Sequence, residues 1–178
     1  MKTSFAFLLI FAVTTGCSMT QNASDDLSEH DPWVIRTFSD RPELWASLKD
    51  RIVAPVGSFG FRANVRFVDD PKYHGLTGID LVHALPSDYP SGFVFVADGD
   101  TSPDNEDIIT LVYFYPDSTN AADYERPPSA VPATDLQSVR HLPHVVQELE
   151  NNLSIANIDT TDVQNGVPAD GIYRGIDQ

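Results

Sequence analysis

Cysteine and basic residues are scarce in this chain, which holds one Cys, Cys17, and 11 Lys and Arg residues among 178. Without a second cysteine no disulfide can form within the chain, so its fold must be stabilised by the hydrophobic core alone. The shortage of cations excludes nucleic acid as a partner, because phosphate contacts need clustered Lys and Arg side chains. The sequence also contains no HExxH, GxSxG, GxxxxGK[ST] or CxxC motif, so it shows none of these signatures of catalysis or phosphate binding.

The apolar run Phe5–Val13 has nine residues and is too short to cross a bilayer as a helix. A lysine precedes the run, and this pattern is typical of the core of a signal peptide. Residues 14–17 follow as Thr-Thr-Gly-Cys, and small residues ending in Gly-Cys resemble the lipobox of bacterial lipoproteins, although a threonine stands where that motif usually has leucine. The sequence therefore predicts a lipoprotein signal peptide over residues 1–16 and lipidation of Cys17.

Lipidation of Cys17 would anchor the protein to a lipid bilayer, because two or more acyl chains hold a protein firmly at a membrane. Ser18 rather than Asp follows the cysteine, and the resemblance to bacterial lipoproteins then implies the outer membrane of the cell envelope, facing the periplasm. If Cys17 is an ordinary residue beside a signal-peptidase site, the protein is instead secreted. Residues 17–31 have the polar composition of a flexible tether, and residues 32–178 are predicted to form one globular domain.

Acidic residues are abundant, with 26 Asp and Glu and a formal net charge of -15. Removal of residues 1–16 takes away Lys2 and no acid, so the mature chain has a charge of -16. Mutual repulsion that keeps the protein soluble is the simplest explanation of this surplus. The same charge also suits a basic protein partner or bound cations.

Hydrophobic periodicity predicts an α+β (mixed α/β) single domain, with a sheet of about five strands packed with three to four helices. The strands are expected at residues 33–38, 62–69, 92–97, 108–115 and 171–175, with short edge strands around 129–131 and 153–156. The helices are expected at residues 42–52 and 78–85, over 136–151 with a new start at Pro143, and after Thr160 or Thr161. Residues 92–97 are predicted to be central, covered on both faces and paired antiparallel with the following strand.

The densest group of carboxylates lies in the loop from Asp98 to Asp107. Asp98, Asp100 and Asp104 are weak candidates for calcium ligands, because hard cations bind several oxygens on a flexible loop. The glycine of this loop does not stand at the sixth position, and no Glu ends a twelve-residue loop. A solvated hairpin loop needs the same polar residues and is the simpler interpretation, so no metal or other cofactor is expected.

Six polar side chains are candidates for a ligand site: Arg62, Asp69, Asn151, Asn152, Asn157 and Arg174. Arginine can hold a carboxylate or phosphate by two parallel hydrogen bonds, although structural ion pairs with the abundant acids are the simpler explanation of these arginines. The aspartate follows a strand end, where it also serves to stop the strand. The asparagines lie in the stretch Glu150–Asp159, where they can also satisfy the carbonyls at a helix end. Convergence on one cavity would indicate a ligand site, and mutual hydrogen bonds would indicate a structural role.

Several segments resemble an uncharacterised bacterial family, a domain of unknown function. The resemblance is carried by Val34-Ile-Arg-Thr37, Gly60-Phe-Arg-Ala63, Phe67-Val-Asp-Asp-Pro71, Glu150–Asn157 and Asp170–Gly175. The run Glu-Asn-Asn-Leu-Ser-Ile-Ala-Asn is its most specific part. The resemblance covers residues 33–176 and implies one compact domain, but it brings no reaction, cofactor or catalytic residue.

The charge and the missing motifs together predict a membrane-anchored, non-catalytic binding domain, of an inhibitory or immunity type toward a basic protein. Two alternatives stay open. One is an envelope hydrolase in which Asp69, Asp70, Asp98, Arg62 and the carboxamides of the three candidate asparagines converge in one pocket. The other is a purely structural envelope lipoprotein.

Overall fold

A computed structural model describes residues 30–100, 106–115 and 125–176. The expected signal peptide, Cys17, nearly all of the tether and Asp104 lie outside the described residues. Within those ranges, no helix has both the length and the apolar character that crossing a membrane requires.

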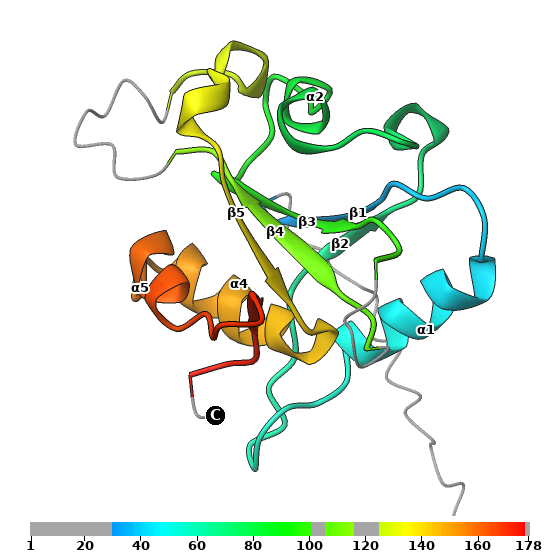
Figure 1. The fold of residues 1–178 in the computed structure, drawn as a ribbon, viewed down its shortest axis with the longest axis vertical. Helices are drawn as coiled ribbons and strands as arrows, with labels where there is room; N and C mark the ends of the chain where they lie inside the picture. The colour runs from blue at the N-terminus through cyan, green and yellow to red at the C-terminus, as the bar shows by residue number, and fades with distance from the viewer. Residues whose placement is uncertain (1–29, 101–105, 116–124, 177–178) are drawn as a thin grey trace, which may run out of the picture.

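A six-stranded mixed sheet forms the centre of the domain, in the order β2-β1-β3-β4-β5-β6 (Figure 1). The strands are β1 Trp33–Arg36, β2 Arg66–Val68, β3 Phe93–Ala97, β4 Ile109–Tyr113, β5 Gln137–His141 and β6 Ile172–Tyr173. β1 pairs in parallel with β2 and β3, β4 is antiparallel to β3 and β5, and β6 is parallel to β5. The predicted α+β single domain is confirmed, with slightly more strands than expected.

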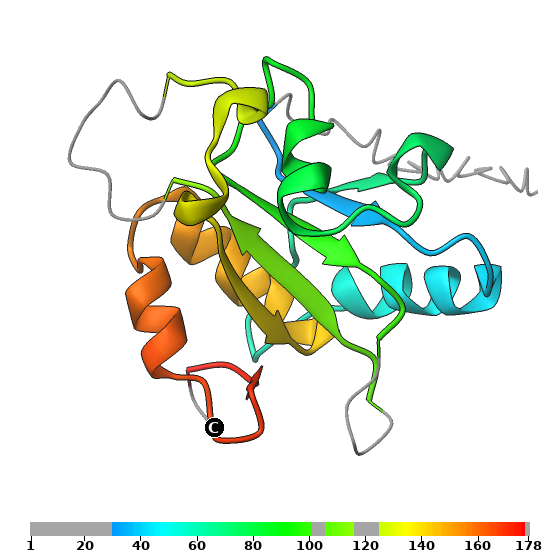
Figure 2. The same ribbon diagram turned by 45° about the horizontal axis from the view of Figure 1, so that its top comes forward.

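Helices cover both faces of this sheet (Figures 1 and 2). One face is covered by α1 Pro42–Ile52, α4 Val146–Ser154 and α5 Thr160–Asn165, and the other by α2 Gly78–His83. Four short 3₁₀ turns complete the described elements: η1 Pro71–Tyr73, η2 Pro128–Ala130, η3 Ala133–Asp135 and η4 Pro143–Val145. The placement of α1 and α4 on one face positions the site described below.

β3 is the strand between the two halves of the core. All five of its residues are buried. Phe93 and Phe95 belong to the core cluster under α1 and α4, whereas Val94 and Val96 belong to the cluster under α2. A strand covered on both faces has a continuous apolar sequence instead of an alternating one. The predicted central place of this strand and its antiparallel pairing with β4 are confirmed.

The expected helix over residues 136–151 forms only in its second half. Residues 137–141 form β5, because hydrogen bonding to β4 on one side and β6 on the other outweighs local helix propensity. Pro143 begins a new helical turn, as predicted, and α4 follows it. The expected edge strands are wrong: residues 129–131 lie mainly in η2, and residues 153–156 contain the end of α4 and a turn.

That turn after α4 is a Schellman motif with an alanine in the position that glycine usually occupies. The N–H of Ala156 donates to the carbonyl of Leu153 at 3.2 Å, and the N–H of Asn157 donates to the carbonyl of Asn152 at 2.9 Å. Ala156 has a φ of 52°, in the left-handed region where a Cβ atom is unfavourable. The turn is therefore closed by two hydrogen bonds at a cost in backbone strain.

His141 ends β5 and is completely buried. Its ring packs edge-on against Phe95 with centroids 5.6 Å apart, and its Nδ1 lies 3.0 Å from the carbonyl oxygen of Leu142. Burial lowers the pKa of His141 to about 4, and the charge of His144 acts in the same direction, while the hydrogen bond to Leu142 opposes it. The imidazole is therefore neutral in the folded state at neutral pH and donates from Nδ1.

We expect Ala156→Gly to raise the free energy of unfolding by about 1 kcal/mol, because glycine adopts the left-handed conformation without the Cβ penalty. Urea denaturation of the two proteins measures the difference. As a control, Gln147→Gly inside α4 is expected to lower the free energy of unfolding by roughly 0.5 to 1 kcal/mol. A similar loss of stability in both variants would contradict the strain assigned to Ala156.

The buried histidine predicts a loss of stability in acid. Its pKa is lower in the folded chain than the ordinary value of 6.5, so the unfolded state binds more protons between pH 6.5 and pH 4. Stability should be complete above pH 6.5 and should fall toward pH 4 by on the order of 3 kcal/mol from this residue. His141→Gln keeps a donor but does not titrate, so its urea denaturation midpoint should depend less on pH in this window. Parallel pH profiles for the two proteins would refute this origin of acid sensitivity.

Candidate functional site

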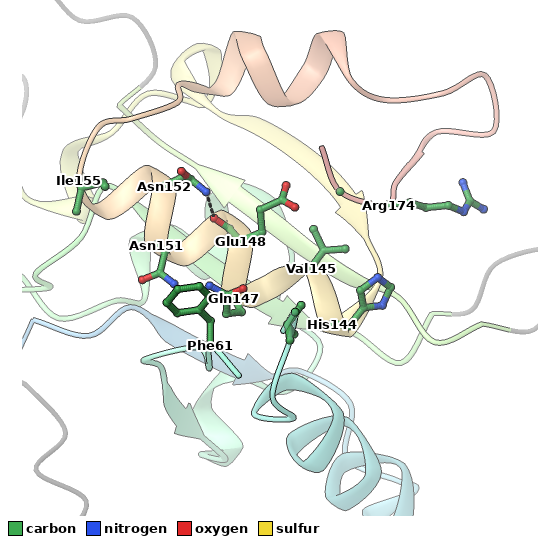
Figure 3. Close-up of a pocket in the computed structure, with 12 residues that line it drawn as sticks. Phe61, His144, Val145, Gln147, Glu148, Asn151, Asn152, Ile155 and Arg174 are labelled. Atoms are coloured by element: carbon green, nitrogen blue, oxygen red, sulfur yellow. Dashed lines mark hydrogen bonds between the residues drawn. The ribbon is translucent and has the colours of Figure 1, made fainter. Parts of the chain in front are cut away.

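A groove of about 590 Å³ lies between a hairpin loop and helix α4 (Figure 3). Three separate parts of the chain form its walls: the loop after α1, the η4–α4 segment and the residues after β6. Residues that line it include Phe61, Val145, Glu148, Asn151, Ile155 and Arg174. The groove therefore exists only because α1 and α4 pack on the same face of the sheet.

The hairpin at residues 56–61 holds two aromatic rings at the rim of the groove. Val56 and Phe61 exchange both backbone hydrogen bonds, at 2.8 and 3.0 Å. Gly57 and Gly60 have φ angles of 68° and 67°, which allow the chain to reverse over the short loop between them. Phe59 and Phe61 are 85% and 57% exposed, and their ring centroids are 5.9 Å apart. The loop thus presents a pair of phenylalanine rings to solvent.

Arg62 connects this hairpin to the end of α1. Its Nη1 donates to the carbonyl oxygen of Val53 at 2.8 Å, and Val53 is the residue that caps the end of α1. A cation at this end of a helix also interacts favourably with the helix dipole. Arg62 does not line the groove, so this candidate ligand residue fixes the position of the loop that carries the two rings.

The three asparagines of the stretch Glu150–Asp159 have different roles. Asn152 donates from Nδ2 to the carbonyl oxygen of Glu148 at 2.8 Å, and its Oδ1 accepts from Asn157 Nδ2 at 2.7 Å. Both side chains thus support the end of α4, and Asn157 lies in the turn instead of at the end of a strand. Asn151 lines the groove close to Phe61, and its carboxamide has no hydrogen-bond partner among the described residues (Figure 3). It is the asparagine whose donors and acceptor are free for a ligand.

Glu150, beside these asparagines, points into the protein and not into the groove. It is 5% exposed, and its Oε2 accepts the backbone N–H of Asn64 at 3.1 Å. Burial raises the pKa of Glu150, and the charge of Asp31 adds to this effect, while the bonds from Asn64 and the Ser154 hydroxyl oppose it. Its role is to join α4 to the segment that leads into β2.

Glu148 is the carboxylate that lines the groove. Its Oε1 accepts the Tyr173 hydroxyl at 2.7 Å, and the N–H of Ile176 lies 3.2 Å from both carboxylate oxygens. The pKa of Tyr173 is raised by burial first and by this carboxylate second, so the phenol keeps its proton and donates it. Two donors therefore hold the Glu148 carboxylate in place, and neither of them is a cation.

Arg174 also lines the groove, but its charge is already paired. Its Nη1 lies 2.7 Å from a carboxylate oxygen of Asp170, and its Nη2 lies 3.8 Å from Glu106. The hydrogen bond from the N–H of Ile172 first, and the bond from Arg174 second, hold the pKa of Asp170 below its ordinary value. Arg174 is therefore a poor candidate for binding a further anion.

Asp69 lies away from the groove, just after β2. Its Oδ2 is 2.9 Å from Arg36 Nη1, and its Oδ1 is 3.7 Å from His74 Nε2. Of the six candidate ligand residues, the structure brings Asn151, Asn152 and Arg174 to one groove, and it leaves Arg62, Asp69 and Asn157 outside the lining.

The two weak calcium candidates that the structure describes, Asp98 and Asp100, lie in a third place, after β3. Asp98 accepts the N–H of Asp100 at 2.9 Å and the hydroxyl of Thr110 at 3.3 Å, and burial raises the pKa of its carboxyl. Asp100 pairs with Arg140 at 3.3 Å. Across the ranges 30–100, 106–115 and 125–176, no group of three or more His, Cys, Asp or Glu could hold a metal ion. The carboxylates of the hydrolase hypothesis, Asp69, Asp70 and Asp98, thus have separate partners and do not line the groove.

The residues that sequence reasoning missed are the apolar ones at the rim, Phe59, Phe61 and Ile155, together with Glu148. Aromatic residues are normally expected inside a protein. One local signal pointed to the exposed pair. Phe59 lies between Gly57 and Gly60 in the segment Gly-Ser-Phe-Gly, and this composition is typical of a turn.

Comparison with known proteins gives a family and nothing more specific. Residues 31–176 match a family described as a domain of unknown function, DUF6924. No curated protein and no solved structure matches the chain. The matched region contains every strand and helix described above, and all of the groove. The chain therefore belongs to the DUF6924 family of domains of unknown function.

Proposed function

We propose that this chain is a lipid-anchored protein of the bacterial cell envelope, whose domain is a non-catalytic docking module for a basic partner protein. Acylation of Cys17 holds it at the outer membrane, facing the periplasm, and the groove beside α4 receives the partner. Docking of this kind suits an inhibitory or immunity-type role.

The gathering of exposed apolar side chains at one groove is the observation that supports docking. Four large apolar side chains are exposed in the described ranges: Phe59, Phe61, Ile155 and Ile176. Phe61 and Ile155 line the groove and Phe59 packs on Phe61, whereas Ile176 lines a separate pocket that shares Gly175 with the groove. Exposed hydrophobic residues that are scattered singly need no explanation, but a set collected around one concavity is typical of an interaction surface. Buried aromatic anchors also supply much of the binding energy in protein interfaces.

The polar groups of the groove support binding more than catalysis. A carboxylate pair with separated pKa values, or a nucleophile beside a base, is the usual arrangement in a hydrolase. The acidic residue among the lining residues is Glu148, which two neutral donors already hold. The amide of Asn151 is suited to hydrogen bonding with a partner backbone or side chain.

The charge of the chain supports a basic partner. With a formal charge of -15, the protein repels other acidic proteins and accelerates its encounter with basic ones. The basic side chains in the described ranges do not reverse this field locally, because most of them pair with acids of the same chain, as Arg36, Arg51 and Arg140 do.

The docking function can be tested with the variant Phe59→Ser/Phe61→Ser. The mature, acylated protein in detergent is immobilised and exposed to an envelope extract at low salt. We expect the wild type to retain a basic protein that raised salt releases, and the variant to retain at least about tenfold less of it, because both ring anchors are gone.

Ser58→Ala, an exposed change in the same hairpin, is the matched control and should behave like the wild type. The melting temperature of each variant reports whether it is folded. Equal retention by the wild type and the double variant, or no retained protein at all, would contradict the proposal.

The membrane anchor can be tested separately at Cys17. Replacement Cys17→Ser should abolish incorporation of labelled palmitate and release the protein from the membrane fraction, because no other thiol exists in the chain. Ser18→Ala is the control and should leave the acylation intact. A Cys17→Ser protein that stays in the membrane fraction after a salt wash would disprove lipid anchoring at this residue.

A further inference from the structure

We infer that the groove binds a cationic side chain, arginine or lysine, of the partner, with Glu148 as its counter-charge and the Phe61 ring as its aromatic contact. The inference rests on the proposed docking function and goes one step further, because it names the chemical group that enters the groove.

Glu148 has no cation of its own. Among the described residues no Lys, Arg or His nitrogen forms an ion pair with its carboxylate, whose partners are the Tyr173 hydroxyl and the Ile176 N–H. Both donors are neutral, so the negative charge of the carboxylate is oriented but not compensated. A half-buried carboxylate in this state gains most from a cation that approaches from the open side of the groove.

The two arginines beside the groove and its hairpin have other partners. Arg174 is paired with Asp170 and Glu106, and Arg62 donates to the carbonyl of Val53. Rearranging either arginine toward Glu148 would break these bonds. Neither arginine is therefore available to Glu148, and the counter-charge that we infer comes from the partner.

The other lining residues suit a cationic side chain on an apolar segment. Glu148 and Asn151 are three residues apart on one face of α4, and Ile155 caps the end of the helix four residues after Asn151. Phe61, from the hairpin, lies beside Asn151 and Gln147 of α4 (Figure 3), and Phe59 packs on Phe61. A guanidinium or ammonium group can contact an aromatic face and a carboxylate together, and the Asn151 oxygen can accept a further hydrogen bond. Ile155 and Phe59 remain for apolar neighbours of that cation.

Charge complementarity favours such a partner over a second copy of the chain. A second copy carries the same formal charge of -15 and would place like charges together. A purely apolar segment would cover the rings but would leave Glu148 desolvated without a counter-charge. A basic segment with apolar neighbours would cover the rings and also supply the counter-charge for the carboxylate.

The test uses two blocked pentapeptides, Gly-Leu-Arg-Leu-Gly and the same peptide with citrulline, which has the shape of arginine without its charge. Each is titrated into the mature protein while the backbone and side-chain amide NMR signals are recorded. We expect the arginine peptide to shift the signals of Phe61, Asn151 and Ile155, and the citrulline peptide to bind about tenfold more weakly.

Glu148→Gln is the decisive variant, because its amide oxygen can still accept from Tyr173 while the charge is removed. It should bind the arginine peptide about tenfold more weakly and the citrulline peptide as the wild type does. Glu43→Gln, the same change at an exposed position of α1 outside the groove, should leave both affinities unchanged. Melting temperatures confirm that both variants are folded.

Three results would overturn the inference: no binding of the arginine peptide at millimolar concentration, equal binding of the two peptides, or an unchanged affinity in Glu148→Gln. Concentration-dependent shifts of the groove signals without peptide would assign the groove to a second copy and also overturn it. If Phe59→Ser/Phe61→Ser loses the envelope partner while Glu148→Gln retains it, this inference fails and the docking function stands. If neither variant affects capture, the docking function itself fails.

Discussion

The burial of β3 on both faces is the constraint on which the rest of this structure depends. With Phe95 in one core and Val94 and Val96 in the other, helices have to cover both faces of the sheet. α1 and α4 cover the same face, and their residues Leu48, Ile52 and Val146 meet in one cluster. The loop that leaves α1 is thereby brought beside α4, and the groove between them is a consequence of this layering.

The scarcity of basic residues shapes the surface as much as the abundance of acids does. Arg36, Arg51, Arg126 and Arg140 each pair with an acid, and several basic side chains also lie over aromatic rings. The exposed pairs among them, such as Arg140 with Asp100, contribute little to stability. Their main effect is to remove free positive charge, so the field of the protein stays negative and the carboxylate in the groove keeps its charge uncompensated.

In the stretch Glu150–Asp159, the local sequence predicts the capping role of some asparagines but not the contact of another with the groove. A helix end rich in asparagine predicts capping, and Asn152 and Asn157 do support the end of α4. The exposure of Asn151 to a groove could not be predicted, because the groove needs Phe61 from a hairpin 90 residues earlier in the chain. Asp69 was predicted to belong to the site but does not line the groove. Its position at a strand end does not reveal which other elements lie beside it.

The sequence by itself determined the elements whose pattern is local: the strand at Trp33–Arg36, the apolar β3, the helix that starts at Pro42 and the new helical start at Pro143. Periodicity and turn residues act over a few positions, and they decide these elements directly. Only the tertiary structure decided that residues 137–141 form a strand and that two exposed phenylalanines stand at the rim of the groove that Glu148 lines. These outcomes depend on hydrogen bonds and packing between residues far apart in the chain, which no local pattern contains.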